Sequence, residues 1–250
     1  MRFSVVIPMY NEKAAAPSCI RQLAEALEES AEASSFSYEL IFSDDGSDDG
    51  CGALIRDFAE HTELRHGSVM LLREERNRGK GAAVRRGMLA AAGDVILFTD
   101  CDLAYGCPIL TEMLADFRER GGDLLVGSRA LSPDGYAGYS GIRTLASRLC
   151  RSLLRAVSGF RYTDSQCGIK LFAREAAREL FSRTETDGWA FDFEVLLLAD
   201  RMGYTVREFP VRVLNHRSSK IRLLRDSVRM LREVWRIRRR IARQARLFPD

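Results

Sequence analysis

The chain has 250 residues, a formal net charge of +3, 46% hydrophobic residues and 29% charged residues. This composition indicates a soluble globular protein of one domain, or of one domain with an appendage. No apolar run approaches the ~20 residues of a membrane-spanning helix, so none is expected. The first residues enter a predicted strand at once, so we also expect no signal peptide.

The cysteine pattern argues against disulfides and against a cysteine metal site. No two cysteines are spaced as C-x-x-C. We therefore expect free thiols in a reducing cytoplasm, without metal ligation. The six cysteines are at positions 19, 51, 101, 107, 150 and 167.

In chain order, short apolar runs rich in β-forming residues alternate with longer helical patterns. This alternation predicts an α/β fold with a mostly parallel sheet covered by helices on both faces. The predicted strands of the first half are 3–8, 38–43, 68–73, 94–99 and 123–128, and the predicted helices between them are 17–33, 49–60, 80–92 and 108–120.

The second half is predicted to begin with a mobile Gly- and Ser-rich loop at 130–142. A domain covering 1–220 is then expected to be followed by a separate helical segment, 221–250. The predicted elements are helix 143–158, strand 168–172, helices 173–182 and 191–203, strand 205–213, a basic turn at 215–220 and a long helix at about 221–246.

The most informative pattern is Asp100-Cys101-Asp102, which follows the apolar strand ending at Thr99. Ligands of open α/β sheets bind at the carboxyl ends of the strands. Paired carboxylates there suit Mg²⁺ or Mn²⁺ carrying the phosphates of a substrate. Aspartate is also an ordinary turn residue, so this pattern alone favours a simple turn.

Two earlier strands end in a similar way, which favours a binding site. One runs into Tyr10-Asn11-Glu12, and the other runs into Asp44-Asp45-Gly46-Ser47. Because the carboxyl ends of parallel strands meet at one edge of a sheet, the three polar strand ends predict a single site.

These three motifs, in this order and spacing, resemble the landmarks of the family 2 glycosyltransferases. Those are inverting enzymes with the nucleotide-sugar-binding fold called GT-A. Further segments are similar to the branch that transfers a sugar to a polyprenyl phosphate, above all the dolichyl-phosphate glucosyltransferases. These segments are 77–81, 127–129, 164–172 and 189–194.

The resemblance implies that Asp102 is the direct ligand of Mg²⁺ or Mn²⁺ and that Asp100 contacts the ribose or the metal. Ala104 stands where the mannosyl branch often has Gln, which leaves a third protein ligand in doubt. The resemblance also puts four residues around the nucleoside, namely Pro8, Tyr10, Glu12 and Asp45. From the residues alone, a strand exit and a helix cap are the favoured explanations of these positions, and the resemblance shifts the prediction to a nucleoside site.

Several cations and one hydroxyl are candidates for binding phosphate groups. The resemblance makes the segment 77–81 part of the donor wall, and its small residues at a helix N-terminus suit an anion. Scattered surface charge is the alternative for any single one of them, and Arg85 and Arg86 are expected to be solvated. The candidates are Lys80, Arg129, Lys170, Arg217, Ser218 and Lys220.

The acceptor decides whether the enzyme needs a base. A sugar hydroxyl must lose its proton, whereas a lipid phosphate with a second pKa of ~6 arrives mostly ionised. The carboxylates in the matching motifs are Asp164, Asp192 and Glu194, and capping of a helix is an alternative for Asp192. We expect Asp102, Arg129, Asp192 and Lys220 to act in catalysis.

The last 30 residues hold ten of the 38 Lys and Arg residues but three of the 35 Asp and Glu residues. Steps of three and four residues place arginines on one helix face, opposite an apolar face with Trp235. Such a helix suits an anionic membrane surface. Packing on its own domain is a close alternative, and nucleic acid is not expected as a partner. The arginines are 222, 225, 229, 232, 236, 239, 243 and 246.

The sequence therefore predicts a metal-dependent inverting glycosyltransferase at the cytoplasmic face of a membrane. The expected reaction moves a hexose, glucose from UDP-glucose being favoured, to a polyprenyl phosphate. The alternatives are a hydroxyl acceptor on a saccharide, transfer of mannose from GDP-mannose, and a degenerate sugar-nucleotide-binding protein.

Overall fold

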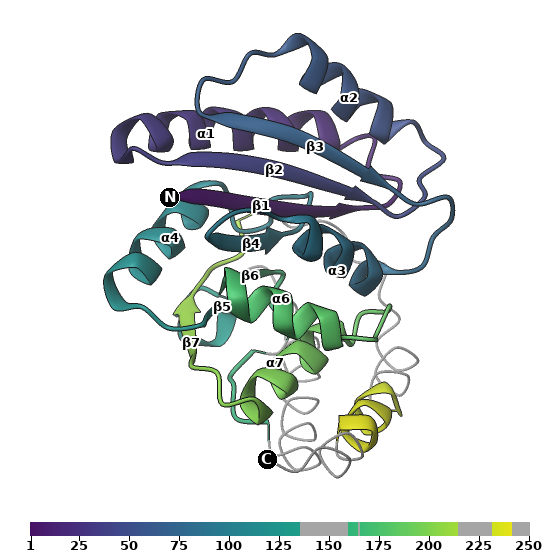
Figure 1. Cartoon of the computed structure of the whole chain (residues 1–250), viewed down its shortest axis with the longest axis vertical. Coiled ribbons are helices and arrows are strands. Elements are labelled where there is room, and N and C mark those ends of the chain that lie inside the picture. The colour runs from purple at the N-terminus through teal and green to yellow at the C-terminus, as the bar shows by residue number, and fades with distance from the viewer. Residues whose placement is uncertain (136–159, 165, 215–231, 242–250) are drawn as a thin grey trace.

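The computed structural model describes residues 1–135, 160–164, 166–214 and 232–241. Its centre is a seven-stranded sheet with the strand order β3-β2-β1-β4-β6-β5-β7 (Figure 1). The strands are β1 (Arg2–Met9), β2 (Ser37–Asp44), β3 (Gly67–Arg73), β4 (Val95–Thr99), β5 (Leu124–Ser128), β6 (Ile169–Ala173) and β7 (Val206–Pro210).

Helices cover both faces of this sheet, as the sequence predicts. Helices α1, α2 and α4 pack on one face, and α3, α6 and α7 pack on the other. Their bounds are α1 (Ala16–Ser34), α2 (Cys51–His61), α3 (Lys80–Ala90), α4 (Pro108–Arg120), α6 (Arg174–Arg183) and α7 (Phe191–Arg201), with a short 3₁₀ turn η1 (Arg129–Leu131).

The sheet is parallel except for β6, which runs antiparallel to both β4 and β5. In this register Thr99 pairs with Ile169, so the start of β6 lies beside the end of β4. Met9 pairs with Asp44 in the same way. The carboxyl ends of β1, β2, β4 and β5 and the amino end of β6 therefore share one edge.

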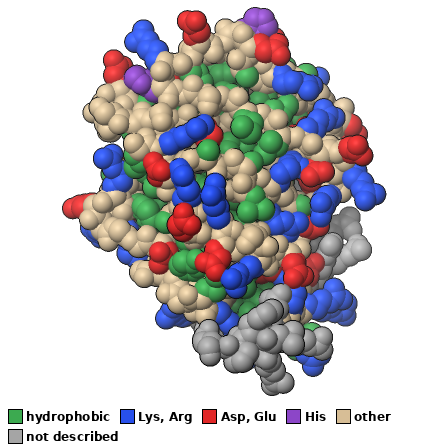
Figure 2. All heavy atoms as spheres, viewed as in Figure 1, with side chains coloured by type: hydrophobic (Ala, Val, Ile, Leu, Met, Phe, Trp, Pro, Cys, Tyr) green, Lys and Arg blue, Asp and Glu red, His purple; other side chains and the backbone are tan. Residues whose placement is uncertain are grey.

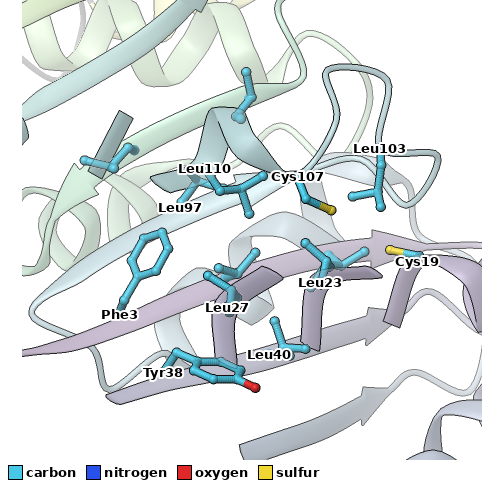
Figure 3. Close-up of a cluster of buried hydrophobic side chains, with 14 of the residues drawn as sticks. Phe3, Cys19, Leu23, Leu27, Tyr38, Leu40, Leu97, Leu103, Cys107 and Leu110 are labelled. Carbon is cyan, nitrogen blue, oxygen red and sulfur yellow. The ribbon is translucent and has the colours of Figure 1, made fainter. Parts of the chain in front are cut away.

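The core on the α1 side anchors the loop that follows β4. Leu103 has a positive φ of 46° and is 3% exposed. Its side chain points into the cluster that contains Cys19, Leu23 and Cys107 (Figure 3). Burying such a side chain stabilises the fold by about 1.5–3 kcal/mol, so the turn at 100–103 is held to the core from below.

The expected helix 143–158, most of the loop 130–142 and the basic turn 215–220 lie outside the described residues. Of the predicted helix 221–246, the structure describes 232–241, which is helical. The five described cysteines are free and buried, in agreement with the expected free thiols. Among the described residues, no helix combines the length and the apolar character that crossing a bilayer requires.

Surface charge does not single out a site on the face seen in Figure 2. On the face seen in Figure 2, Lys and Arg side chains alternate with Asp and Glu side chains over the whole view. The site is therefore located from side-chain geometry at the sheet edge.

Candidate active site

The two aspartates of the Asp-x-Asp motif lie at the carboxyl end of β4, where the sequence predicts them. The carboxylate of Asp102 accepts a hydrogen bond from the backbone N–H of Ala104 at 3.1 Å. Asp100 forms an ion pair with Lys80, with 2.5 Å between Nζ and Oδ1. The backbone of the turn thus holds the Asp102 carboxylate, and Lys80 of α3 holds the Asp100 carboxylate.

A glycine beside Asp100 makes room for its carboxylate. A Cβ atom built on Gly168 would lie 2.2 Å from Oδ2 of Asp100, closer than any real Cβ contact. The backbone N–H of Gly168 donates to the Tyr105 hydroxyl at 3.2 Å. A side chain at position 168 would therefore displace the Asp100 carboxylate from its place at the start of β6.

Behind Asp100, charges of alternating sign lead from the sheet edge into the core. Lys170 is fully buried, donates to the Cys167 carbonyl and forms an ion pair of 2.5 Å with Asp192. Burial raises the pKa of Asp192, although Lys170 and Lys80 act against this. Burial opposes the charge of Lys80, yet Asp100 and Asp192 raise the pKa of that ammonium above its usual value.

This arrangement places Lys170 below the site, where burial separates its ammonium from a ligand at the surface. Asp192 lies in the first turn of α7, and its carboxylate accepts a hydrogen bond from Lys170 and does not cap the helix. Arg129 is likewise committed, since its guanidinium binds Asp164 through Nε at 2.7 Å and Nη2 at 2.9 Å. Burial opposes the ionised form of Asp164, but Arg129 lowers the pKa of that carboxyl.

The nucleoside candidates surround the ends of β1 and β2. Tyr10 is 47% exposed, whereas Pro8 is buried within β1 and Glu12 is partly buried. Asp45 is 2% exposed and accepts hydrogen bonds from the backbone N–H groups of Arg78 at 3.0 Å and Gly79 at 2.7 Å. Asp45 therefore fixes the segment that leads into α3.

Further hydrogen bonds join the two strand exits. The N–H of Asn11 donates to Ser47 Oγ at 2.9 Å, and the N–H of Asp48 donates to the Asn11 side chain at 3.0 Å. Asn11 has a positive φ of 54°, a conformation that asparagine adopts more readily than most residues. These bonds hold the loop with Tyr10 against the loop with Asp45.

The N-terminus of α3 differs from the expected anion site. The N–H groups of Gly81 and Ala82 donate to the Asp187 carbonyl at 2.8 and 3.3 Å. A Cβ on Gly79 or Gly81 would lie within 2.4 Å of the backbone oxygens of Asp187 and Thr186, respectively. The glycines thus serve a close backbone approach, and the helix end is capped by the chain itself.

The two arginines of α3 also differ from expectation, because neither is simply solvated. Arg85 donates to Asp187, and Arg86 pairs with Glu74 and donates to the Asp44 carbonyl at 2.8 Å. Sequence reasoning missed Asp187 altogether. The signal in the sequence is the pair of glycines at 79 and 81, because two glycines at the start of a helix are typical of a close backbone approach.

Arg217, Ser218 and Lys220 lie outside the described residues, so their positions in the site stay predictions.

Trp189 is 64% exposed, and its ring centroid is 4.9 Å from Lys80 Nζ. The described residues contain no group of three or more His, Cys, Asp or Glu side chains that would enclose a metal. A pair of carboxylates suits Mg²⁺ or Mn²⁺, because these ions keep several waters and bind substrate phosphates.

Comparison with known proteins agrees with this geometry. The chain is 34% identical over 248 residues to a dolichyl-phosphate beta-glucosyltransferase of Drosophila melanogaster, covering 95% of this chain and 74% of that protein. It is 33% identical over 231 residues to the dolichyl-phosphate beta-glucosyltransferase of Homo sapiens, and the match covers 88% of this chain and 69% of the human protein.

A solved structure shares the fold. Glucosyl-3-phosphoglycerate synthase from Mycobacterium tuberculosis, crystallised with Mn²⁺, UDP and phosphoglyceric acid, has a TM-score of 0.68 at 21% identity, covering 94% of this chain and 76% of that chain. The family model described as Glycosyl transferase family 2 matches residues 4–181, which is most of the chain. The chain therefore belongs to glycosyltransferase family 2 and is a glycosyltransferase with a GT-A-like fold.

Proposed function

We propose that the protein transfers glucose from UDP-glucose to a polyprenyl phosphate, with inversion and with a divalent metal, at the cytoplasmic face of a membrane. The observation that carries the proposal is the Asp100–Asp102 pair at the sheet edge with Lys80 beside it. The dolichyl-phosphate beta-glucosyltransferases among the relatives support glucose as the sugar and a lipid phosphate as the acceptor.

Asp102 and Asp100 would hold Mg²⁺ or Mn²⁺, which when bound would neutralise the leaving diphosphate. Lys80 supplies a second positive charge next to Asp100. Tyr10 offers an exposed aromatic face to a base, and Asp45 shapes the wall of the nucleoside site through Arg78 and Gly79.

The three carboxylates of the matching motifs favour an acceptor that needs no base. Asp164 is engaged by Arg129, Asp192 by Lys170, and Glu194 by two backbone N–H groups. All three are buried. A phosphate acceptor arrives mostly ionised, so positioning and positive charge suffice, whereas a hydroxyl acceptor requires a carboxylate within hydrogen-bond reach.

An acceptor panel tests this proposal directly. The protein is incubated with labelled UDP-glucose, Mn²⁺ and equal amounts of undecaprenyl phosphate, undecaprenol or a soluble oligosaccharide. We expect label on the lipid phosphate alone. Label on undecaprenol or on the oligosaccharide would instead favour the hydroxyl-acceptor alternative and would require a base among the remaining carboxylates.

The nucleotide preference provides a further prediction. UDP is expected to bind more tightly than GDP in the presence of Mn²⁺, as measured by calorimetry. Asp45→Ala should weaken UDP binding by about 1–3 kcal/mol, because the backbone N–H groups of Arg78 and Gly79 lose the buried carboxylate that positions the donor wall. Tighter binding of GDP would move the assignment to the mannosyl alternative.

Membrane contact is expected through the exposed arginines of the C-terminal segment. In helix 232–241, Arg232, Arg236, Arg239 and Trp235 are exposed, while the opposite face is buried. Each arginine near an anionic surface contributes about 1 kcal/mol, and salt screens this attraction. Vesicle co-sedimentation should therefore show binding to anionic lipid that is lost in high salt and absent with zwitterionic lipid.

A variant separates docking from folding. Replacing these three arginines and Arg229 with Gln should lower transfer to undecaprenyl phosphate in vesicles and spare transfer to a short soluble lipid phosphate. Equal loss on both acceptors would show that the arginines support the fold or the site and do not dock the protein.

A further inference from the structure

The segment between α6 and α7, residues 184–190, covers the start of α3. Its Asp187 carbonyl caps the helix, and its Asp187 carboxylate pairs with Arg78 at 3.3 Å and Arg85 at 2.6 Å. Its Trp189 lies against Lys80. The position of the Lys80 ammonium next to Asp100 therefore depends on where this segment lies.

A buried carboxylate holds the segment from the core side. Glu194 of α7 is fully buried, and its two carboxylate oxygens accept the backbone N–H groups of Glu185 at 3.1 Å and Thr186 at 2.8 Å. A carboxylate taken out of water in this way needs a compensating positive charge as well as hydrogen bonds.

That positive charge comes from the C-terminal helix. The Arg240 guanidinium forms an ion pair with Glu194 and a second ion pair, of 3.0 Å, with Glu185. Arg240 does not belong to the regular arginine stripe of the sequence. It borders the apolar side of helix 232–241, formed by Val234, Ile237 and Ile241, which are all buried in the same cluster as α7.

We propose that helix 232–241, through Arg240, fixes the segment 184–190 and thereby sets the position of Lys80 at the site. Arg240 is a positioning residue, since it acts through Glu194 and Glu185. The same short helix exposes arginines on its outer side and inserts Arg240 on its inner side. A surface that displaces the helix would therefore also release the segment beside the active site. The kinetic part of this inference rests on the proposed function.

The two tryptophans of the chain allow a direct measurement of the segment. In a Trp235→Phe background, the fluorescence anisotropy of Trp189 reports on residues 184–190 alone. Arg240→Gln should lower this anisotropy and reduce kcat/KM for the sugar nucleotide about tenfold, with a short soluble acceptor. Arg240→Lys keeps the charge but offers a single ammonium to two carboxylates, so its values should lie between those of Arg240→Gln and the parent.

Arg183→Gln is the matched control, because Arg183 is an exposed arginine paired with Glu179 on α6. It should leave both readouts unchanged. Anisotropy and kcat/KM of Arg240→Gln that equal those of Arg183→Gln would overturn the proposal. If the parent transfers no glucose, the proposed function fails, whereas the anisotropy still decides the role of Arg240.

A second variant covers the case in which Arg240→Gln does not fold. Ile237→Ala weakens the seat of the same helix without leaving Glu194 unpaired. The anisotropy of Trp189 should fall in this variant too. An unchanged value would mean that the segment does not depend on the helix.

Discussion

Replacing Asp102 with alanine is expected to abolish sugar transfer while the fold stays intact. The side chain lies in the turn after β4 and accepts a hydrogen bond from the backbone N–H of Ala104. Losing that bond costs about 1 kcal/mol of folding free energy. Losing a ligand that supports the charge on the leaving diphosphate removes at least about 3 kcal/mol of transition-state stabilisation.

Initial rates and thermal melting of the same samples separate these two effects. Asp57→Ala serves as control, because Asp57 is an exposed carboxylate of α2. It should keep full activity. Substantial transfer by the Asp102 variant, or full activity of the parent in excess EDTA, would contradict the assigned metal site.

The second large effect is on stability and concerns the buried Lys170–Asp192 pair. Lys170→Met should lower the free energy of unfolding by about 3–5 kcal/mol, because it leaves a buried carboxylate without its counter-charge. Replacing both residues, as Lys170→Met with Asp192→Leu, removes the uncompensated charge and should restore most of the loss. Urea unfolding followed by circular dichroism measures both variants.

The pH dependence of the single variant provides a further check. Burial already raises the pKa of Asp192, and removing Lys170 takes away a neighbour that lowers it. A raised pKa in the folded state means that the protonated carboxyl fits the fold better than the ionised one. The destabilisation should therefore be small below the ordinary carboxyl pKa of about 3.9 and should grow as the pH rises above it. A loss independent of pH would point to a packing defect.

The sequence predicted the sheet edge well because the signals there are local. An apolar strand followed by turn-forming aspartates fixes both the element and the position of Asp100 and Asp102. Where the structure gives the bounds of an element, the predicted strands and helices agree with them to within three residues, with strand 205–213 ending early at Pro210.

Residues whose role depends on long-range pairing could not be predicted in this way. Lys170 is expected at a phosphate, but β6 inserts antiparallel between β4 and β5 and buries it against Asp192. The strand pattern predicts that β6 exists without fixing its direction. The capping of α3 by Asp187 likewise joins positions more than 100 residues apart.

The C-terminal helix illustrates the same limit. Its periodicity predicts which arginines face outward, and Arg232, Arg236 and Arg239 are indeed exposed. Tertiary packing decides which residue pairs with Arg240, so the helix sequence alone could not predict its ion pair with Glu194. In the described part of the helix, packing on the domain is thus observed, and membrane contact stays a proposal for the outer face.

Transfer of glucose to a lipid phosphate is proposed to take place at the Asp100–Asp102 site. Its most direct test is the organic-phase yield from labelled UDP-glucose, Mn²⁺ and undecaprenyl phosphate, with the protein and its Asp102→Ala variant measured side by side. A glucosyl phosphate lipid is expected with the protein, and none with the variant or with EDTA. Labelled lipid formed equally by the variant, or no labelled lipid from a protein that binds UDP and Mn²⁺, would contradict it.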